Sequence, residues 1–149
     1  MNAMIAAGLV AGVLDIVNAI AFWRLYAGTS ATTILQSVAA GLLGKAAFAG
    51  GATTAAFGLV LHLLMMCAMA AVYWLAARRW PSLLAKPLAA GLAFGLLTWA
   101  AMNYVVVPLS RAAAPSFILP WFVDGLLAHL LLVGIPFAFV ARWSASRVS

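Results

Sequence analysis

The sequence predicts an all-α integral membrane protein with four transmembrane helices. Of its 149 residues, 68% are hydrophobic and only 7% are charged. A soluble domain is nearer half apolar and a quarter charged, and a short globule cannot hide this much apolar surface from water. Four apolar stretches reach the roughly 20 residues that a helix needs to cross a bilayer. We therefore expect a single transmembrane domain over residues 1–149, with the lipid bilayer as its partner.

The four spans have recognisable ends. Asp15 interrupts the first apolar stretch and no basic segment precedes it, so we expect a retained helix and not a signal peptide. Pro87 and Pro120 suit the first turn of a helix, where the missing N–H costs nothing. Pro136 lies inside the last span and should bend it. The spans are expected at residues 3–24, 53–77, 87–107 and 120–141.

The segment between the first two spans, residues 30–43, is too short to cross a bilayer. Its larger apolar side chains recur at helical spacing, with polar residues between them. We expect an amphipathic helix that lies on the membrane interface. Its apolar stripe consists of Ile34, Leu35, Val38 and Leu42.

The formal net charge of +6 reflects membrane topology and not nucleic-acid binding. The basic residues lie singly or in pairs at the ends of the apolar stretches, as the positive-inside rule requires. Five of them lie on the side that holds both termini and the loop between the second and third spans, against three on the other side. This difference favours cytoplasmic termini. The five are Arg78, Arg79, Lys86, Arg142 and Arg147, and the three are Arg24, Lys45 and Arg111.

Two pairs of segments suggest that a helical hairpin occurs twice. "AAGLVAGVLD" at 6–15 aligns without gaps with "AAGLAFGLLT" at 89–98, and "GLVLHLLMM" at 58–66 resembles "GLLAHLLLV" at 125–133. Equivalent helices run in the same direction, so the repeats would be related by a pseudo-two-fold axis along the membrane normal. A chance likeness stays open, because Gly, Ala and Leu are common in this chain.

Glycines mark the faces on which the spans are expected to pack. Small residues let helix backbones approach closely in lipid, and this contact holds membrane bundles together. The first and third spans each carry a GxxxG pair, and in the other two a glycine precedes a histidine by one turn, leaving space beside the imidazole. These packing glycines are Gly8, Gly12, Gly58, Gly91, Gly95 and Gly125.

Polar residues lie on the same faces as the glycines. Four of them fall nine residues from the outer ends of their spans, about 13 Å deep at 1.5 Å per residue. They form an expected buried cluster of Asp15, His62, His129 and Thr98. A second, shallower layer consists of Asn18, Asn103 and Asp124.

Several functions suit such a cluster. An ionisable group inside a span is a functional hypothesis by default, and a His/Asp cluster could handle protons or a small ligand. His62 and His129 could instead bind haem b, with the neighbouring glycines leaving room for the macrocycle. A further alternative is a Cu(I) site, and another is a purely structural polar core that binds nothing. The soft copper ligands would be His62, Met65, Met66, Cys67 and Met69.

An enzyme is the least supported class, and we identify no catalytic residue. No serine or cysteine nucleophile has an obvious base nearby, because Cys67 lies about 140° around the helix from His62 at 3.6 residues per turn. The chain also has no glycine-rich phosphate loop. A homo-oligomer stays open.

The second half of the chain resembles the YagU-like proteins, a family of small bacterial inner-membrane proteins without an established mechanism. Two histidines frame the likeness, which covers about residues 62–129, and a Leu-Pro-Trp motif stands at 119–121. The resemblance implies a multi-span protein of the bacterial inner membrane and implies no reaction. It rests on His62, Tyr73, Pro81, Gly91, Pro108, the Leu-Pro-Trp motif and His129.

The charge distribution yields a prediction of topology. A reporter that is active only in the cytoplasm should be active when fused at Ser149 and inactive when inserted within residues 112–117. A reporter that is active only outside the cytoplasm should give the reverse pattern. Export of the Ser149 fusion would contradict the charge argument.

Overall fold

The computed structural model describes residues 2–113 and 117–147 of the chain, and this part is helical and contains no strand. It holds four helices that are long and apolar enough to cross a membrane. The expected all-α architecture with four spans is thereby confirmed. The spans extend one to four residues beyond most of the expected ends, since Asn2–Ala27, Gly51–Arg79, Pro87–Leu109 and Leu119–Ala145 are their bounds.

Shorter elements connect or subdivide these spans. Helix α2 begins after Ser30, whose side-chain oxygen accepts a hydrogen bond from the Thr33 backbone N–H. Pro87 occupies the first turn of α5, as expected. The elements are α1 (Asn2–Ala27), α2 (Ala31–Leu43), the 3₁₀ helix η1 (Gly44–Ala49), α3 (Gly51–Arg79), α4 (Ser82–Ala85), α5 (Pro87–Ala101), the π-helix η2 (Met102–Val106), α6 (Val107–Leu109), α7 (Leu119–Ala128), the π-helix η3 (His129–Gly134) and α8 (Ile135–Ala145).

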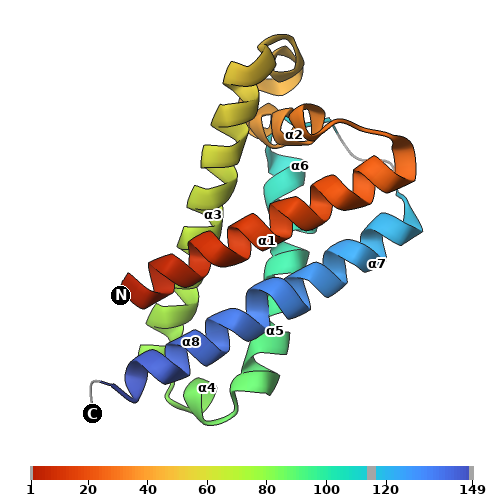
Figure 1. Cartoon of the computed structure of the whole chain (residues 1–149). Coiled ribbons are helices and arrows are strands. Elements are labelled where there is room, and N and C mark those ends of the chain that lie inside the picture. Colours follow the sequence, from red (N-terminus) through yellow and green to blue (C-terminus); the bar gives the residue numbers. More distant parts are fainter. Residues whose placement is uncertain (1, 114–116, 148–149) are drawn as a thin grey trace.

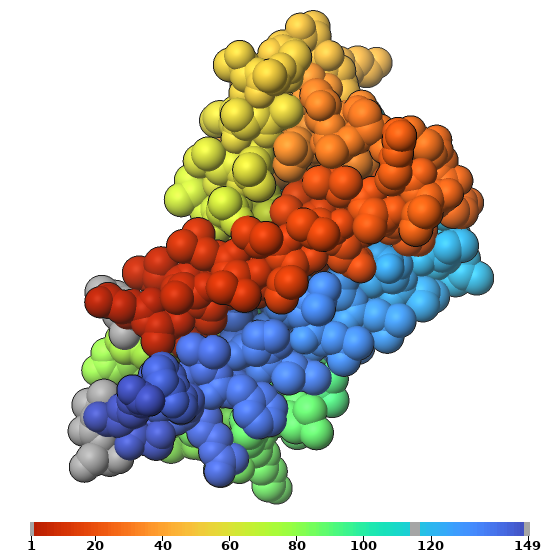
Figure 2. All heavy atoms as spheres, viewed as in Figure 1, coloured from red at the N-terminus to blue at the C-terminus, as the bar shows by residue number. Residues whose placement is uncertain are grey.

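The spans are arranged in two layers. Helix α1 and the last span, α7–η3–α8, run antiparallel beside each other, with α3 and α5 behind them (Figure 1). The space-filling view shows α1 and the last span in contact along one face (Figure 2). The described ends of the chain and α4 lie toward one end of the molecule, and α2 lies toward the other. We call these the terminal end and the α2 end.

The interior is built from small side chains, and many large apolar side chains face outward. Ala11 and Ala70 are 1% and 0% exposed, whereas Leu64 and Leu97 are 62% and 63% exposed. Lipid tails are as apolar as leucine, so burying leucine between helices gains little in a membrane, while small residues allow closer backbone packing. The distribution is therefore the one expected of a bundle surrounded by lipid.

Close backbone contacts at glycines join the spans in pairs. A methyl group added to Gly8 on α1 would lie 2.8 Å from the Cα atom of Cys67 on α3. On α5, a methyl group at Gly91 would lie 2.8 Å from the carbonyl oxygen of Gly134 in the last span. One at Gly95 would collide with the carbonyl oxygen of His129. No larger residue fits these crossings unless a backbone moves.

Helix α2 packs closely against α3 at its small residues, and of the expected apolar stripe Ile34 is buried while Leu42 is exposed. A methyl group at Gly58 of α3 would collide with the carbonyl oxygen of Leu35. Ala39 and Ala40 are buried, while Leu42, a member of the expected stripe, is 53% exposed. The reason is the glycine, which admits the backbone of α2 so closely that only small side chains fit between the helices.

Polar contacts fix both ends of α2. The buried Gln36 side chain donates hydrogen bonds to the carbonyl oxygen of Gly51, at 3.0 Å, and to the Thr54 hydroxyl, at 3.3 Å. At the C-terminus of α2, the Arg111 backbone N–H donates to the Gly41 carbonyl oxygen at 2.8 Å. The Arg111 guanidinium reaches the Leu42 carbonyl oxygen at 3.4 Å. Helix α2 is thus tied to the second span and to the end of the third.

Two π-helical segments occur where proline interrupts a span. The N–H of Val107 bonds to the Met102 carbonyl oxygen, and that of Ile135 bonds to the Leu130 carbonyl oxygen, a separation of five residues. Each segment is followed closely by a proline, Pro108 or Pro136. A proline has no N–H and its ring clashes with the carbonyl four residues before it, so a wider turn accommodates it. We expected Pro136 to bend the last span, and the structure contains this local change of helix type.

Gly58 and Gly125 should respond differently to alanine. At Gly58 the added methyl group meets the α2 backbone, so Gly58→Ala should destabilise the protein by about 1–3 kcal/mol, the usual cost of overpacking. At Gly125 the nearest atom, Trp99 Nε1, would lie 3.6 Å away, an ordinary contact. Gly125→Ala is therefore the matched control and should be neutral or slightly stabilising. Thermal unfolding in detergent would measure both, and equal losses would contradict the packing described.

Candidate polar site within the membrane

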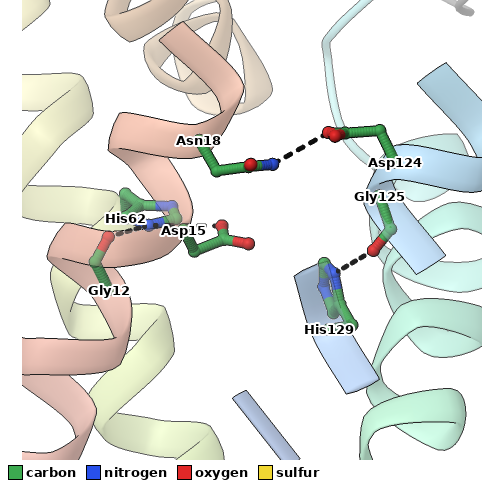
Figure 3. Close-up of polar contacts among 7 residues, drawn as sticks. All are labelled: Gly12, Asp15, Asn18, His62, Asp124, Gly125 and His129. Atoms are coloured by element: carbon green, nitrogen blue, oxygen red, sulfur yellow. Dashed lines mark hydrogen bonds and ion pairs between the residues drawn. The ribbon is translucent and has the colours of Figure 1, made fainter. Parts of the chain in front are cut away.

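The centre of the polar site is a contact between α1 and α3. The His62 Nε2 atom lies 3.0 Å from the Gly12 carbonyl oxygen and 3.7 Å from Asp15 Oδ2. A carbonyl oxygen only accepts, so Nε2 carries a proton and donates it to Gly12. Both side chains are largely buried, with 9% of His62 and 16% of Asp15 exposed. Figure 3 shows the imidazole against α1, with Asp15 one turn further along the same helix.

The carboxylate of Asp15 is weakly satisfied. Within the described residues its one polar contact is the 3.7 Å ion pair with His62. Strong charge-assisted hydrogen bonds are shorter, about 2.7–2.9 Å, and the His62 Nε2–H already donates to Gly12. A carboxylate in this position retains several unused acceptor sites. The free energy of an ionised Asp15 is therefore unfavourable unless a proton or another donor reaches it.

A second polar contact joins α1 to α7. The Asn18 side-chain Nδ2 donates to Asp124 Oδ2 at 2.8 Å. Asn18 follows Asp15 by almost one helical turn, and both are drawn on the side of α1 that faces the last span (Figure 3). Asp15 and Asp124 are the two acidic residues of the whole chain. All of its carboxylate side chains therefore lie inside spans and near the contact between α1 and the last span.

His129 lies on the far side of Asp15 but bonds to its own helix. Its Nδ1 atom lies 2.9 Å from the Gly125 carbonyl oxygen, so Nδ1 carries a proton and donates it. His129 is half-buried and is the first residue of the π-helix η3. Figure 3 shows the ring across from Asp15, with no bond drawn between them.

Thr98, expected in the buried cluster, and Asn103, expected in the second polar layer, lie outside these contacts. The Thr98 hydroxyl is buried but donates to carbonyl oxygens of its own helix, those of Phe94 and Gly95. The Asn103 side chain is exposed and donates to the Trp99 carbonyl oxygen. The structure therefore brings together Asp15 with His62 and Asn18 with Asp124, and bonds neither Thr98 nor Asn103 to them.

The surroundings of the two histidines differ from the open space expected for haem b. The space at Gly58 is filled by the backbone of α2, and Gly125 faces the Trp99 indole, so these glycines leave no slot for a macrocycle. In addition, Nε2 of His62 is held by the Gly12 carbonyl oxygen. The expectation that a glycine gives clearance beside each imidazole is wrong for Gly58, because the backbone of α2 fills that space, whereas Gly125 still has room for a methyl group.

The soft side chains of α3 also fail to converge on a copper site. Met66 is buried, with its Cβ and Cγ atoms beside Gly12. Cys67 lies beside Gly8, with its thiol 3.8 Å from the Ile5 carbonyl oxygen. His62 also contacts Gly12, through its carbonyl oxygen, so that Cys67 meets α1 about one turn away from both. Within the described residues, no group of three or more His, Cys, Asp or Glu side chains could hold a metal ion.

One essential partner was not apparent from the sequence. The Gly12 carbonyl oxygen accepts the hydrogen bond from His62, although we expected Gly12 only to provide packing space. Every residue has a carbonyl group, so no residue type marks this acceptor in a sequence. The usable signal is indirect: a glycine one turn before an intramembrane acid permits the close approach that exposes a backbone oxygen to a neighbouring helix.

Comparisons with protein-family models, with curated proteins and with solved structures found no match for this chain.

The geometry predicts which of these polar residues are energetically coupled. Asp15→Asn and His62→Leu should be non-additive by about 0.5–3 kcal/mol, because residues in direct contact share an interaction. Asp15→Asn and His129→Leu should be additive within about 0.5 kcal/mol, because His129 bonds to its own helix. Unfolding of the single and double variants in detergent would measure both cycles. Strong coupling of Asp15 to His129 would contradict this assignment.

Proposed function

We propose that this chain is a small membrane protein whose Asp15–His62 pair takes up and releases protons within the bilayer. The observation that carries the proposal is the under-satisfied Asp15 carboxylate, 3.7 Å from an imidazole. Histidine is the side chain whose charge changes most readily near neutral pH, and an adjacent carboxylate favours its charged form. A proton shared by such a pair lowers the cost of keeping either group in a span.

The surroundings of the pair favour a proton over a larger solute. Helix α1 packs so closely on α3 that a methyl group at Gly12 would lie 2.9 Å from Leu63 Cδ2 and 3.2 Å from the Met66 Cβ atom. A cavity of about 110 Å³ lies elsewhere, in apolar surroundings. A proton needs no cavity, whereas a solute does. That cavity is lined by Met4, Ile5, Cys67, Ala71, Trp74 and Leu75.

A second candidate function is purely structural. The Asn18–Asp124 hydrogen bond at 2.8 Å links α1 to α7, and such interhelical bonds stabilise membrane bundles by about 1 kcal/mol. On this alternative, the polar residues only lock the four spans together. The two candidates differ in whether His62 changes its protonation state over the physiological pH range.

We further propose a bacterial inner-membrane location with cytoplasmic termini and membership of the YagU-like family. The location is supported by the four apolar helices and the greater number of basic residues near the terminal end. The family proposal rests on the residues of the second half of the chain that carry the resemblance. Helix α2 is proposed to lie at the opposite membrane interface, which its position away from the termini supports (Figure 1).

We also propose that the four spans arose as a duplicated hairpin. The closest contact of Gly8 is with Cys67, and that of Gly91 is with Gly134. Gly91 follows Gly8 by 83 residues, and Gly134 follows Cys67 by 67 residues. These are the same offsets that align the repeated segments of the sequence. Gly12 lies beside Leu63, and Gly95 lies beside His129 and Leu130, of which Leu130 follows Leu63 by 67 residues. Matching contacts at matching offsets are hard to obtain by chance similarity of composition.

A titration of the histidine rings would test proton uptake. In ¹⁵N-labelled protein, the His62 ring signals should shift between pH about 5 and 8, the range in which histidine changes charge. In Asp15→Asn the pH dependence of these signals should change, because the amide cannot share a proton with the imidazole. Asn18→Ala is the matched control, since it alters a polar residue of α1 that does not contact His62. Ring signals that stay constant over this range would contradict proton uptake and favour the purely structural role.

A further inference from the structure

The main buried core and the Asn18–Asp124 hydrogen bond lie on opposite sides of the level of Asp15. The main buried core lies entirely on the terminal side of this level, in residues 4–11, 66–77 and 133–141. Met4, Val133 and Phe137 are 2%, 0% and 0% exposed. From Asp15 to the start of α1, its inward face carries apolar side chains or glycine over about 20 Å, at 1.5 Å per residue.

On the other side of this level α1 carries the buried Ile16 and then the polar, half-buried Asn18. Asn18 follows Asp15 and bonds to Asp124, and both residues are half-buried. Beyond them, Phe22 and Trp23 meet Trp121 with ring centroids 5.2 and 5.4 Å apart. The contact between α1 and α7 thus runs from the Asp15 level through an amide–carboxylate pair to an aromatic group at the α2 end.

We infer that the Asp15–His62 pair exchanges protons with the α2 end of the membrane alone, through the contact between α1 and α7. The inference rests on the proposed proton uptake. A proton needs successive donors and acceptors or water. The terminal half offers no such route from the pair, because its buried core is mostly apolar and its cavity of about 110 Å³ is lined by apolar side chains, which keep such a cavity dry. Asn18 and Asp124 provide polar groups in the opposite direction, and Asp124 can itself accept a proton.

Every element packed near the pair is consistent with this direction. The titratable groups that face this level are Asp15 on α1, His62 on α3, Asp124 on α7 and His129 on η3. Helices α2, α5 and α8 add no ionisable side chain at this level. In the terminal half, the Tyr73 hydroxyl donates to the Leu83 carbonyl oxygen of α4, far from the pair, and the Cys67 thiol donates to that of Ile5.

One-sided access distinguishes a proton-responsive site from a conduit. A site open to one compartment follows the pH of that compartment and carries no net proton current. Protonation of the pair changes the charge between α1 and α3, and the Asn18–Asp124 bond joins α1 to α7. The expected output is therefore a change in the packing of α1 that depends on the pH at the α2 end.

Cysteine labelling in vesicles would test the direction of access. In a Cys67→Ala background, Asn18→Cys should react with a membrane-impermeant cationic thiosulfonate at least about tenfold faster from the α2 side than from the terminal side, equivalent to about 1.4 kcal/mol of barrier. Ala11→Cys, one turn before Asp15 and 1% exposed, is the matched control and should stay unreactive from both sides. Ala46→Cys and Ser82→Cys, exposed at opposite ends, report the orientation. Faster reaction of Asn18→Cys from the terminal side, equal reaction from both, or none would overturn the inference.

A second measurement follows the proton itself in the unaltered chain. In oriented vesicles, the His62 ring signals should respond to the pH of the bath on the α2 side and stay unchanged when only the terminal-side pH is altered. A response to the terminal-side pH would overturn the inference while leaving proton uptake intact. Signals that respond to neither bath would instead refute proton uptake, on which the inference depends.

Discussion

The close approach of helix backbones at glycine is the contact on which the rest of this structure depends. In lipid the hydrophobic effect does not drive one helix against another, so association rests on van der Waals packing and interhelical hydrogen bonds. Gly8 and Gly12 bring α1 against α3, and Gly91 and Gly95 bring α5 against the last span. The large leucines are left facing outward, which costs nothing in a bilayer.

The polar site is a product of the same contact. Because Gly12 lets α3 approach α1, the His62 imidazole reaches a backbone carbonyl oxygen that larger side chains would shield. The bond holds the ring beside Asp15 but uses the Nε2 proton that would otherwise satisfy the carboxylate. A rigid scaffold therefore keeps an acid and a base close together and incompletely paired.

The sequence was sufficient for the spans and for the general location of the site, and insufficient for its pairing. Twenty-residue apolar stretches must cross the bilayer as helices, because only helices satisfy their own backbone in lipid. Depth along a span follows from counting, which placed Asp15 and His62 together. The orientation of a side chain depends on helix rotation, and this is set by neighbours that the sequence does not specify. Thr98 and Asn103 consequently bond to their own helix, and α2 packs through its alanines instead of its stripe.

The π-helical segment η3 limits which insertions and deletions the last span can accommodate. A π turn holds one more residue than an α turn, so it is equivalent to a single-residue insertion in a regular helix. Removing one residue from His129–Gly134 would convert the segment to a regular α-helix and leave α7 and α8 in phase, whereas removing two residues would rotate α8 by about 100° relative to α7. The contact of α7 with α1 and the contact of α8 with α5 could then no longer form at the same time. The length of this segment, more than its composition, is what the fold constrains.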